Sequence, residues 1–164
     1  MLALILSFSV SVHEDWFVQE SEDKEFSLLV PHKLNKYSKK TLSEVGELTL
    51  ISYQSDKADS YQNHYSLSYI DYPEDSFEMD DSLRIELART TVEGLPGDTV
   101  YEELSKGSAY YTVLSRKKLE EQNLYSKSKV FVVGYRVYIM MVYAPNDRAI
   151  NSGIDLFLDS FKLL

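Results

Sequence analysis

The sequence contains no cysteine. This absence excludes a disulfide-stabilised scaffold, a thiol nucleophile and a cysteine-ligated zinc site. Histidine is scarce as well. The three histidines, His13, His32 and His64, lie in different segments, and none has the spacing of a helical zinc-binding pair. We therefore expect no metal ion and no catalytic histidine.

Glycine and proline are also few, with six and four residues respectively. The glycines form no phosphate-binding loop, and the Gly-x-Ser-x-Gly motif of a serine hydrolase is missing. A hydrolase or a metal-dependent enzyme would need a site that the fold gathers from distant segments. The sequence therefore favours a protein that is not an enzyme and binds no cofactor.

Basic residues are outnumbered, with 17 Lys and Arg against 26 Asp and Glu, which gives a net charge of −9. An acidic chain repels phosphate backbones, so we expect no nucleic-acid partner. The sequence has one short basic run, which we predict to be a solvated loop. It contains Lys33, Lys36, Lys39 and Lys40.

No apolar run reaches the roughly 20 residues that a membrane-spanning helix requires. Residues 1–12 (MLALILSFSVSV) instead have the length of the apolar region of a secretory signal, and Ser9-Val10-Ser11 offers a small-x-small cleavage pattern. No Lys or Arg precedes Lys24, although a signal peptide normally begins with positive charge. We expect residues 1–14 to be a truncated signal peptide or a flexible N-terminus. The alternative is a buried N-terminal strand.

Hydrophobic residues make up 44% of the chain and charged residues 26%, which is typical of a globular protein. We expect residues 15–164 to form one domain. Strands are predicted at 16–18, 25–30, 47–54 and 64–72. In the last of these, Tyr65, Leu67 and Tyr69 share one face of the strand.

A helix is predicted after Pro73, with Asp80 and Asp81 near its positive N-terminus and Gly94 near its end. Asp98 is a capping residue, so the segment from 98 to about 105 is predicted to be a further helical turn. Two more strands are expected at 110–119 and 124–133.

The last third of the chain carries the strongest inference about architecture. Gly134 permits the positive φ of a tight hairpin, so 130–133 and 136–143 should pair antiparallel. Apart from Arg136 the second strand is apolar on both faces, which is typical of a strand covered on both sides. The apolar residues that follow recur at helical spacing: Ile150, Ile154, Phe157, Leu158 and Phe161.

These elements predict an α+β protein, a three-layer α/β/α sandwich around a central antiparallel sheet. The C-terminal helix should cover one face of the sheet, and the region from 80 to 105 should cover the other. Phe157 should then be buried against side chains such as Ile139 or Met141.

The order of these elements, with a C-terminal helix ending in Phe-x-Asp-Ser-Phe, resembles the PsbP-like family. The matching residues are Phe26 and Pro31, Gly134-Tyr135-Arg136-Val137-Tyr138, and Phe157, Asp159, Ser160 and Phe161. This family includes extrinsic photosystem subunits, a Ran-binding import factor and many exported bacterial proteins. The resemblance spans residues 16–164 and rests on packing motifs. It implies a scaffold used mainly for binding and assembly, and it carries over no ligand-binding residue.

An acidic stretch precedes the predicted middle helix. Oxygen ligands at close spacing are what calcium requires, but this stretch has no glycine for a ligand-wrapping turn. Carboxylates are also common at the positive N-terminus of a helix, and we favour this explanation. The stretch consists of Asp71, Glu74, Asp75, Glu78, Asp80 and Asp81.

Tyrosine is abundant, at 13 of 164 residues. Tyrosines are enriched at binding surfaces and are also common in antiparallel sheets. Core packing is the expected role of Tyr65, Tyr69 and Tyr138. The candidate interaction surface comprises the tyrosines near strand ends and loops, which are Tyr61, Tyr72, Tyr110, Tyr111 and Tyr125.

Three functions remain open at this point. The first is a non-catalytic, exported binding or assembly module, periplasmic or secreted, whose partner is another protein. The second is a small acidic chaperone-like protein of the cytoplasm, which requires residues 1–12 to be folded structure. The third is a hydrolase or metal-dependent enzyme with a dispersed site.

Overall fold

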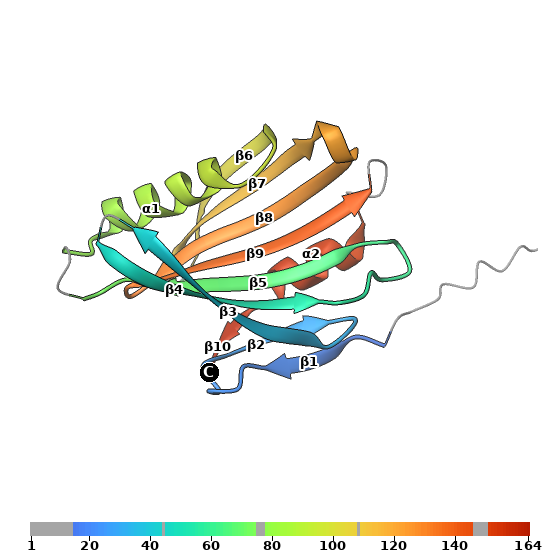
Figure 1. Ribbon diagram of the computed structural model, residues 1–164, viewed down its shortest axis with the longest axis horizontal. Coiled ribbons are helices and arrows are strands. Elements are labelled where there is room, and N and C mark those ends of the chain that lie inside the picture. Colours follow the sequence, from blue (N-terminus) through green and yellow to red (C-terminus); the bar gives the residue numbers. More distant parts are fainter. Residues whose placement is uncertain (1–14, 44, 75–77, 108, 146–150) are drawn as a thin grey trace, which may run out of the picture.

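The computed structural model describes residues 15–43, 45–74, 78–107, 109–145 and 151–164 (Figure 1). Seven antiparallel strands form the main sheet in the order β3-β4-β5-β9-β8-β7-β6. They are β3 (Leu34–Ser43), β4 (Gly46–Ser55), β5 (His64–Asp71), β9 (Arg136–Pro145), β8 (Leu124–Val133), β7 (Tyr111–Leu119) and β6 (Asp98–Lys106). A second sheet has the order β1-β2-β10, with β1 (Phe17–Glu20), β2 (Phe26–Val30) and β10 (Lys162–Leu163).

The two faces of the main sheet are covered by different elements, so the molecule has three layers (Figure 1). Helix α1 (Asp81–Gly94) packs on β7 and β8 and closes a small core that contains Val92 and Val130. The other face holds α2 (Ser152–Asp159) and the small sheet. The larger core between them is rich in aromatic side chains, including Phe26 and Phe131. The predicted α+β sandwich, with the C-terminal helix on one face, is confirmed.

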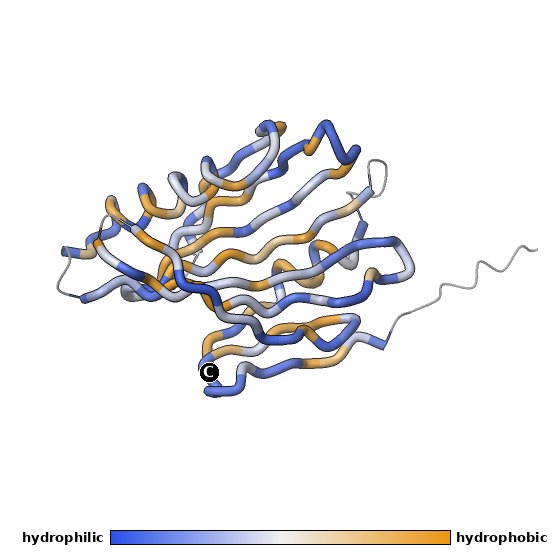
Figure 2. The backbone as a smooth tube through the Cα atoms, viewed as in Figure 1, coloured by the Kyte–Doolittle hydropathy of each residue, from blue (hydrophilic) through white to orange (hydrophobic). Residues whose placement is uncertain are grey.

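The predicted hairpin lies at the centre of the sheet. Val130 pairs with Ile139, Val133 pairs with Arg136, and Gly134 has a φ of 59° in the turn between them. Strand β9 lies between β8 and β5, and its two faces contribute to the two different cores, Tyr138 to one and Val137 to the other, which agrees with its apolar character on both faces. Figure 2 shows β9 as mostly apolar and the edge strand β3 as mostly hydrophilic.

Two predictions of local structure are wrong. The segment expected as a helical turn from Asp98 is strand β6, because Thr99, Val100 and Tyr101 favour extended backbone, and Thr99 and Tyr101 pair with β7. The basic run expected as a loop lies largely in strand β3, which pairs along its whole length with β4. Its side chains are solvent-facing, as expected, because β3 is an edge strand.

Helix α2 ends at Asp159, so Phe161 lies just beyond it and is still buried. Phe157 has no exposed surface, as predicted, but the predicted contacts are wrong. It packs edge-on against Tyr65 of β5, with 5.1 Å between ring centres. Ile139 packs in the other core, under α1, because successive residues of a strand point to opposite faces. Ile150, also assigned to this helix, lies outside the described residues.

The prediction that residues 1–14 are a signal peptide or a flexible N-terminus also falls outside the described residues. In the part of the chain that the structure describes, neither helix is long and apolar enough to cross a membrane.

Candidate functional site

The antiparallel register brings several strand ends together beside Gly134. Arg136 pairs with both Asp71 at the end of β5 and Val133 at the end of β8. Lys106 at the end of β6 pairs with Tyr111 at the start of β7, which adjoins β8. We call this end of the strands the Gly134 end, and the opposite end of the strands the Tyr61 end.

The five candidate tyrosines divide between these two ends. Tyr72 directly follows β5, Tyr110 directly precedes β7 and Tyr111 begins it, so these three lie at the Gly134 end. Tyr61 precedes β5 and Tyr125 begins β8, so these two lie at the Tyr61 end. The candidate set is therefore not one surface, and three of its members share an end of the sheet.

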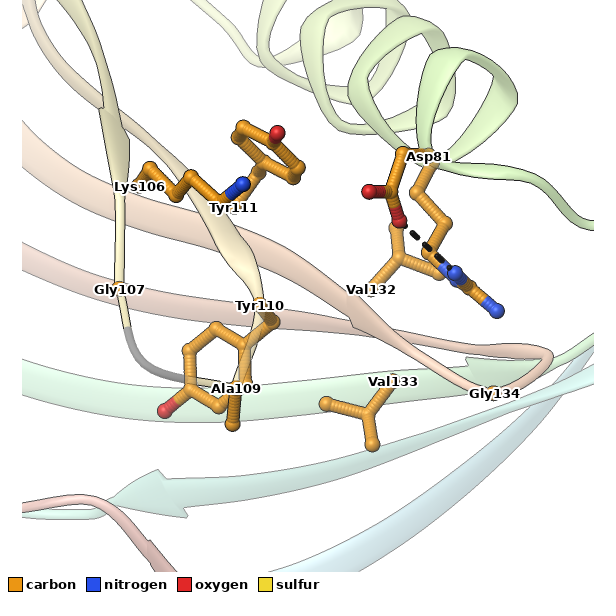
Figure 3. Close-up of a pocket in the computed structure, with 10 residues that line it drawn as sticks. Asp81, Lys106, Gly107, Ala109, Tyr110, Tyr111, Val132, Val133 and Gly134 are labelled. Atoms are coloured by element: carbon orange, nitrogen blue, oxygen red, sulfur yellow. Dashed lines mark hydrogen bonds and ion pairs between the residues drawn. The ribbon is translucent and has the colours of Figure 1, made fainter.

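A first hollow of about 330 Å³ lies at the Gly134 end between the start of α1, the β6–β7 loop and the β8–β9 turn. Figure 3 shows Lys106 and Tyr111 facing Asp81 across it. The Lys106 ammonium lies 5.1 Å from the centre of the Tyr111 ring, and a hydrogen bond with that tyrosine raises the pKa of Lys106. Asp81 is paired with Arg84 at 3.1 Å.

A second hollow of about 550 Å³ surrounds Arg136. Its guanidinium donates to both carboxylate oxygens of Asp71, with Nε–Oδ1 2.5 Å and Nη2–Oδ2 2.9 Å, and also to the carboxylate of Glu25. It lies 4.2 Å above the Tyr69 ring. The hydrogen bonds with Asp71 raise the pKa of Arg136 further above its already high value. These interactions tie β9, β5 and the turn before β2 together, so Arg136 acts as a structural clamp.

A third hollow of about 400 Å³ shares Lys106 and Tyr110 with the first, so the hollows lie on both sides of the β6–β7 loop. Lys129 and Lys162 also line it, and none of its lining residues is acidic. Tyr110 stacks on Phe131 with 4.5 Å between ring centres. Burial raises the pKa of Tyr110 and holds its ring in place. The Gly134 end therefore presents fixed aromatic rings beside lysine side chains.

The Tyr61 end is organised by a buried carboxylate. Asp59 is buried and accepts hydrogen bonds from the backbone N–H groups of Tyr61 and Asn63. It also accepts from the hydroxyl of Tyr65, with an O–O distance of 2.5 Å. Tyr125 lies under the Arg116 guanidinium, 4.6 Å away. These polar groups hold the β4–β5 loop and the start of β8 in place.

The acidic stretch is used locally. Asp80 is the N-cap of α1 and accepts a hydrogen bond from the Leu83 N–H at 2.8 Å, as the helix-start interpretation predicts. The carboxylate of Asp71 accepts hydrogen bonds from the guanidinium of Arg136. Among the described residues, no group of three or more His, Asp and Glu side chains could hold a metal ion.

His32 and His64 lie in separate elements, His32 between β2 and β3 and His64 at the start of β5. His13 lies outside the described residues, as does Asp75 of the acidic stretch.

Sequence reasoning identified Arg136 as the polar interruption of an apolar strand and as part of the motif from Gly134 to Tyr138, but not as a clamp. Its partner Glu25 lies 111 residues away along the chain, and no local pattern links the two. Lys106, which lines two hollows, was not identified at all. The sole signal in the sequence was its position beside Gly107 and the Tyr110-Tyr111 pair.

No protein-family model matches the sequence, and no curated protein matches it. Solved structures that align with this one include the following two. The solution structure of cyanobacterial PsbP (CyanoP) from Synechocystis sp. PCC 6803 is 13% identical over 98% of this chain and 99% of that one, with a TM-score of 0.53. A crystal structure from Bacteroides thetaiotaomicron VPI-5482 is 13% identical over 91% of this chain, with a TM-score of 0.49, and this chain spans only 48% of it.

The CyanoP match extends over nearly the whole of both chains, as the element order of the sequence implied. At this identity the match establishes the fold alone. The chain therefore has the PsbP-like fold.

Proposed function

We propose that this protein is a non-catalytic binding or assembly module that acts outside the cytoplasm, and that its partner is another protein. The observation that carries the proposal is the gathering of Tyr72, Tyr110 and Tyr111 at the Gly134 end, where the hollows lie. Tyrosine offers a large amphipathic contact area at a low entropy cost, and for this reason it is frequent in binding hot spots.

The chemistry of the Gly134 end supports binding rather than catalysis. Its two arginines are engaged by carboxylates, Arg136 by Asp71 and Glu25 and Arg84 by Asp81. The hollows have volumes in the range of small ligand sites, but they are open to solvent and are separated by the β6–β7 loop. This surface fits side chains of a protein partner better than an enclosed substrate.

The proposed location outside the cytoplasm rests on the apolar stretch of residues 1–12 and on the family resemblance. N-terminal sequencing of the protein isolated from its source organism tests it. A mature N-terminus between about residues 11 and 16 is expected from the small-x-small pattern. Intact residues 1–12 in protein recovered from the cytoplasm would contradict this location.

The proposed partner surface is tested by quantitative cross-linking in extracts of the source organism. Tyr111→Ala should lower partner capture about thirtyfold, because truncating a hot-spot tyrosine costs about 2 kcal/mol or more. Tyr61→Ala is the matched control, since Tyr61 is 50% exposed but lies at the other end of the sheet. Equal capture by both variants and by the wild type would remove the Gly134 end as the binding surface.

A further inference from the structure

The main sheet is open at both edges. Strand β3 pairs only with β4 and strand β6 pairs only with β7, so no described strand forms a ladder with the outer edge of either. Figure 1 shows the two edge strands on opposite sides of the sheet. An unpaired strand edge is a template for pairing with another strand, from another chain or from a second copy of this one.

The outer edge of β3 already accepts such a pairing. The side-chain amide of Gln19 donates to the carbonyl of Leu34 and accepts from its N–H, both at 2.8 Å, as a neighbouring strand would. In an antiparallel ladder every second residue directs its N–H and C=O to the same side. Lys36, Ser38 and Lys40 therefore direct theirs outward as well.

The two edges carry opposite charge. Strand β3 contains three lysines, Lys36, Lys39 and Lys40, and no acidic residue. Strand β6 contains Asp98, Glu102 and Glu103 against one lysine, Lys106. Nearly every side chain of β6 is exposed, including those of Val100 and Tyr101. Each edge is thus repelled by a second copy of itself and attracted by the other edge.

We propose that the protein self-associates edge to edge, with β6 of one copy pairing with β3 of the next. This interaction goes beyond the function proposed above and uses a different surface. Five antiparallel strands separate β3 from β6, so the two run in the same direction. Pairing that keeps the helices of both copies on the same sides of the sheet is therefore parallel. Such head-to-tail contacts leave one free edge on each end of a growing assembly, which closes into a ring or extends as an open chain depending on the rotation between copies.

Several local features make this association reversible. Lys36 is paired with Glu22 at 2.9 Å and Asp23 at 3.7 Å, and Lys40 with Glu47 at 2.7 Å. On the other edge, Glu102 lies 3.8 Å from Arg89, so part of the charge on both edges is already compensated. Such exposed ion pairs contribute little to stability and rearrange easily. The register also shifts beside Val100, and a bulge of this kind weakens edge pairing.

Charge reversal tests the proposal directly. One variant carries Lys39→Glu and Lys40→Glu on β3, and a second carries Glu102→Lys and Glu103→Lys on β6. Sedimentation velocity at increasing protein concentration should show association of the wild type in about 0.01 M salt and loss of it in about 1 M salt. Each variant alone should associate at least about tenfold more weakly, because like charges then face each other.

An equimolar mixture of the two variants should recover association, because each acidic edge again meets a basic one. Circular dichroism checks that both variants fold, and all four positions are exposed. A wild type that stays monomeric in low salt would overturn the proposal. A mixture that associates no better than its components would do the same.

The absence of cysteine permits a second measurement. Ser38→Cys marks β3 and Ser105→Cys marks β6, both in the cysteine-free chain. A short thiol cross-linker should join the two variants when they are mixed and should join neither to itself. Self-cross-linking of either single variant as efficient as cross-linking in the mixture would show like-to-like pairing and reject the head-to-tail arrangement.

Discussion

Replacing Phe157 with Ala tests whether α2 holds the aromatic core together. The side chain has no exposed surface and meets the Tyr65 ring edge-on at 5.1 Å. A phenylalanine that buries roughly 150–250 Å² contributes about 4–6 kcal/mol at 25 cal/mol per Å². Measured Phe→Ala changes in protein cores cost about 3–5 kcal/mol, and we expect a value in that range.

This loss would be a large part of the total stability, which for a domain is typically about 5–15 kcal/mol. For a chain of this size, each kcal/mol lowers the melting temperature by about 2–4 °C, so Phe157→Ala should melt roughly 6–20 °C lower. Urea unfolding followed by far-UV circular dichroism gives the free energy. Near-UV circular dichroism should also change, because Tyr65 loses the ring that fixes it.

Leu156→Ala is the matched control on the same helix. Leu156 is 43% exposed, so its truncation should cost no more than about 1 kcal/mol. Asp155→Ala should be similarly mild, because its ion pair with Lys127 is at the surface. Equal and small losses for Phe157→Ala and Leu156→Ala would mean that α2 is not docked on the sheet, and the three-layer architecture would have to be abandoned.

Three further measurements follow from the structure. Lys117 is 3% exposed and donates to the carbonyls of Glu93 at 3.3 Å and Leu95 at 2.7 Å. Lys117→Met should therefore lower the free energy of unfolding, measured in urea, by about 1–3 kcal/mol. Lys118→Met, at the more exposed neighbouring position, should be nearly neutral. Burial raises the pKa of Tyr69 to about 12 from 10.0. Tyr69 should therefore not affect the free energy of unfolding below pH 10, and it should lower that free energy by about 2–3 kcal/mol as the pH rises toward 12. A Tyr69→Phe variant that loses as much stability over this pH range would show that another group is responsible. Millimolar calcium or chelator should leave the melting temperature unchanged, because no group of described side chains could hold a metal ion. A bound ion at 100 times its Kd would add about 2.7 kcal/mol to the free energy of unfolding, so a raised melting temperature would reveal a metal site.

Local signals in the sequence predicted the centre of this fold well. The β8–β9 hairpin depends on one glycine and two apolar strands, all between Leu124 and Pro145, and α1 depends on its cap at Asp80. The edge strands were mispredicted because the usual signal was missing. A strand exposed on both faces shows no apolar alternation, so the lysine run looked like a loop and Asp98 looked like a helix cap.

The candidate site could be predicted only in part. The choice of tyrosines near strand ends included Tyr72, Tyr110 and Tyr111, but their shared location depends on the register of four strands. The clamp at Arg136 joins residues 65 and 111 positions away, and only the folded topology places them together. Side-chain type is readable from one sequence, whereas long-range register is not.

The pairing of β10 with β2 has a consequence for how the protein is made. Lys162 pairs with Ser27, Leu163 pairs with Phe26, and the Leu164 N–H donates to the carbonyl of Glu25 at 2.9 Å. The small sheet therefore joins residues more than 130 positions apart, and contacts of such long sequence separation form late. While the chain is being synthesised, the small sheet cannot be completed until residues 162 and 163 have emerged from the ribosome. The aromatic surface that it covers, including the side chains around Phe26, stays open until then and is available to chaperones during that time.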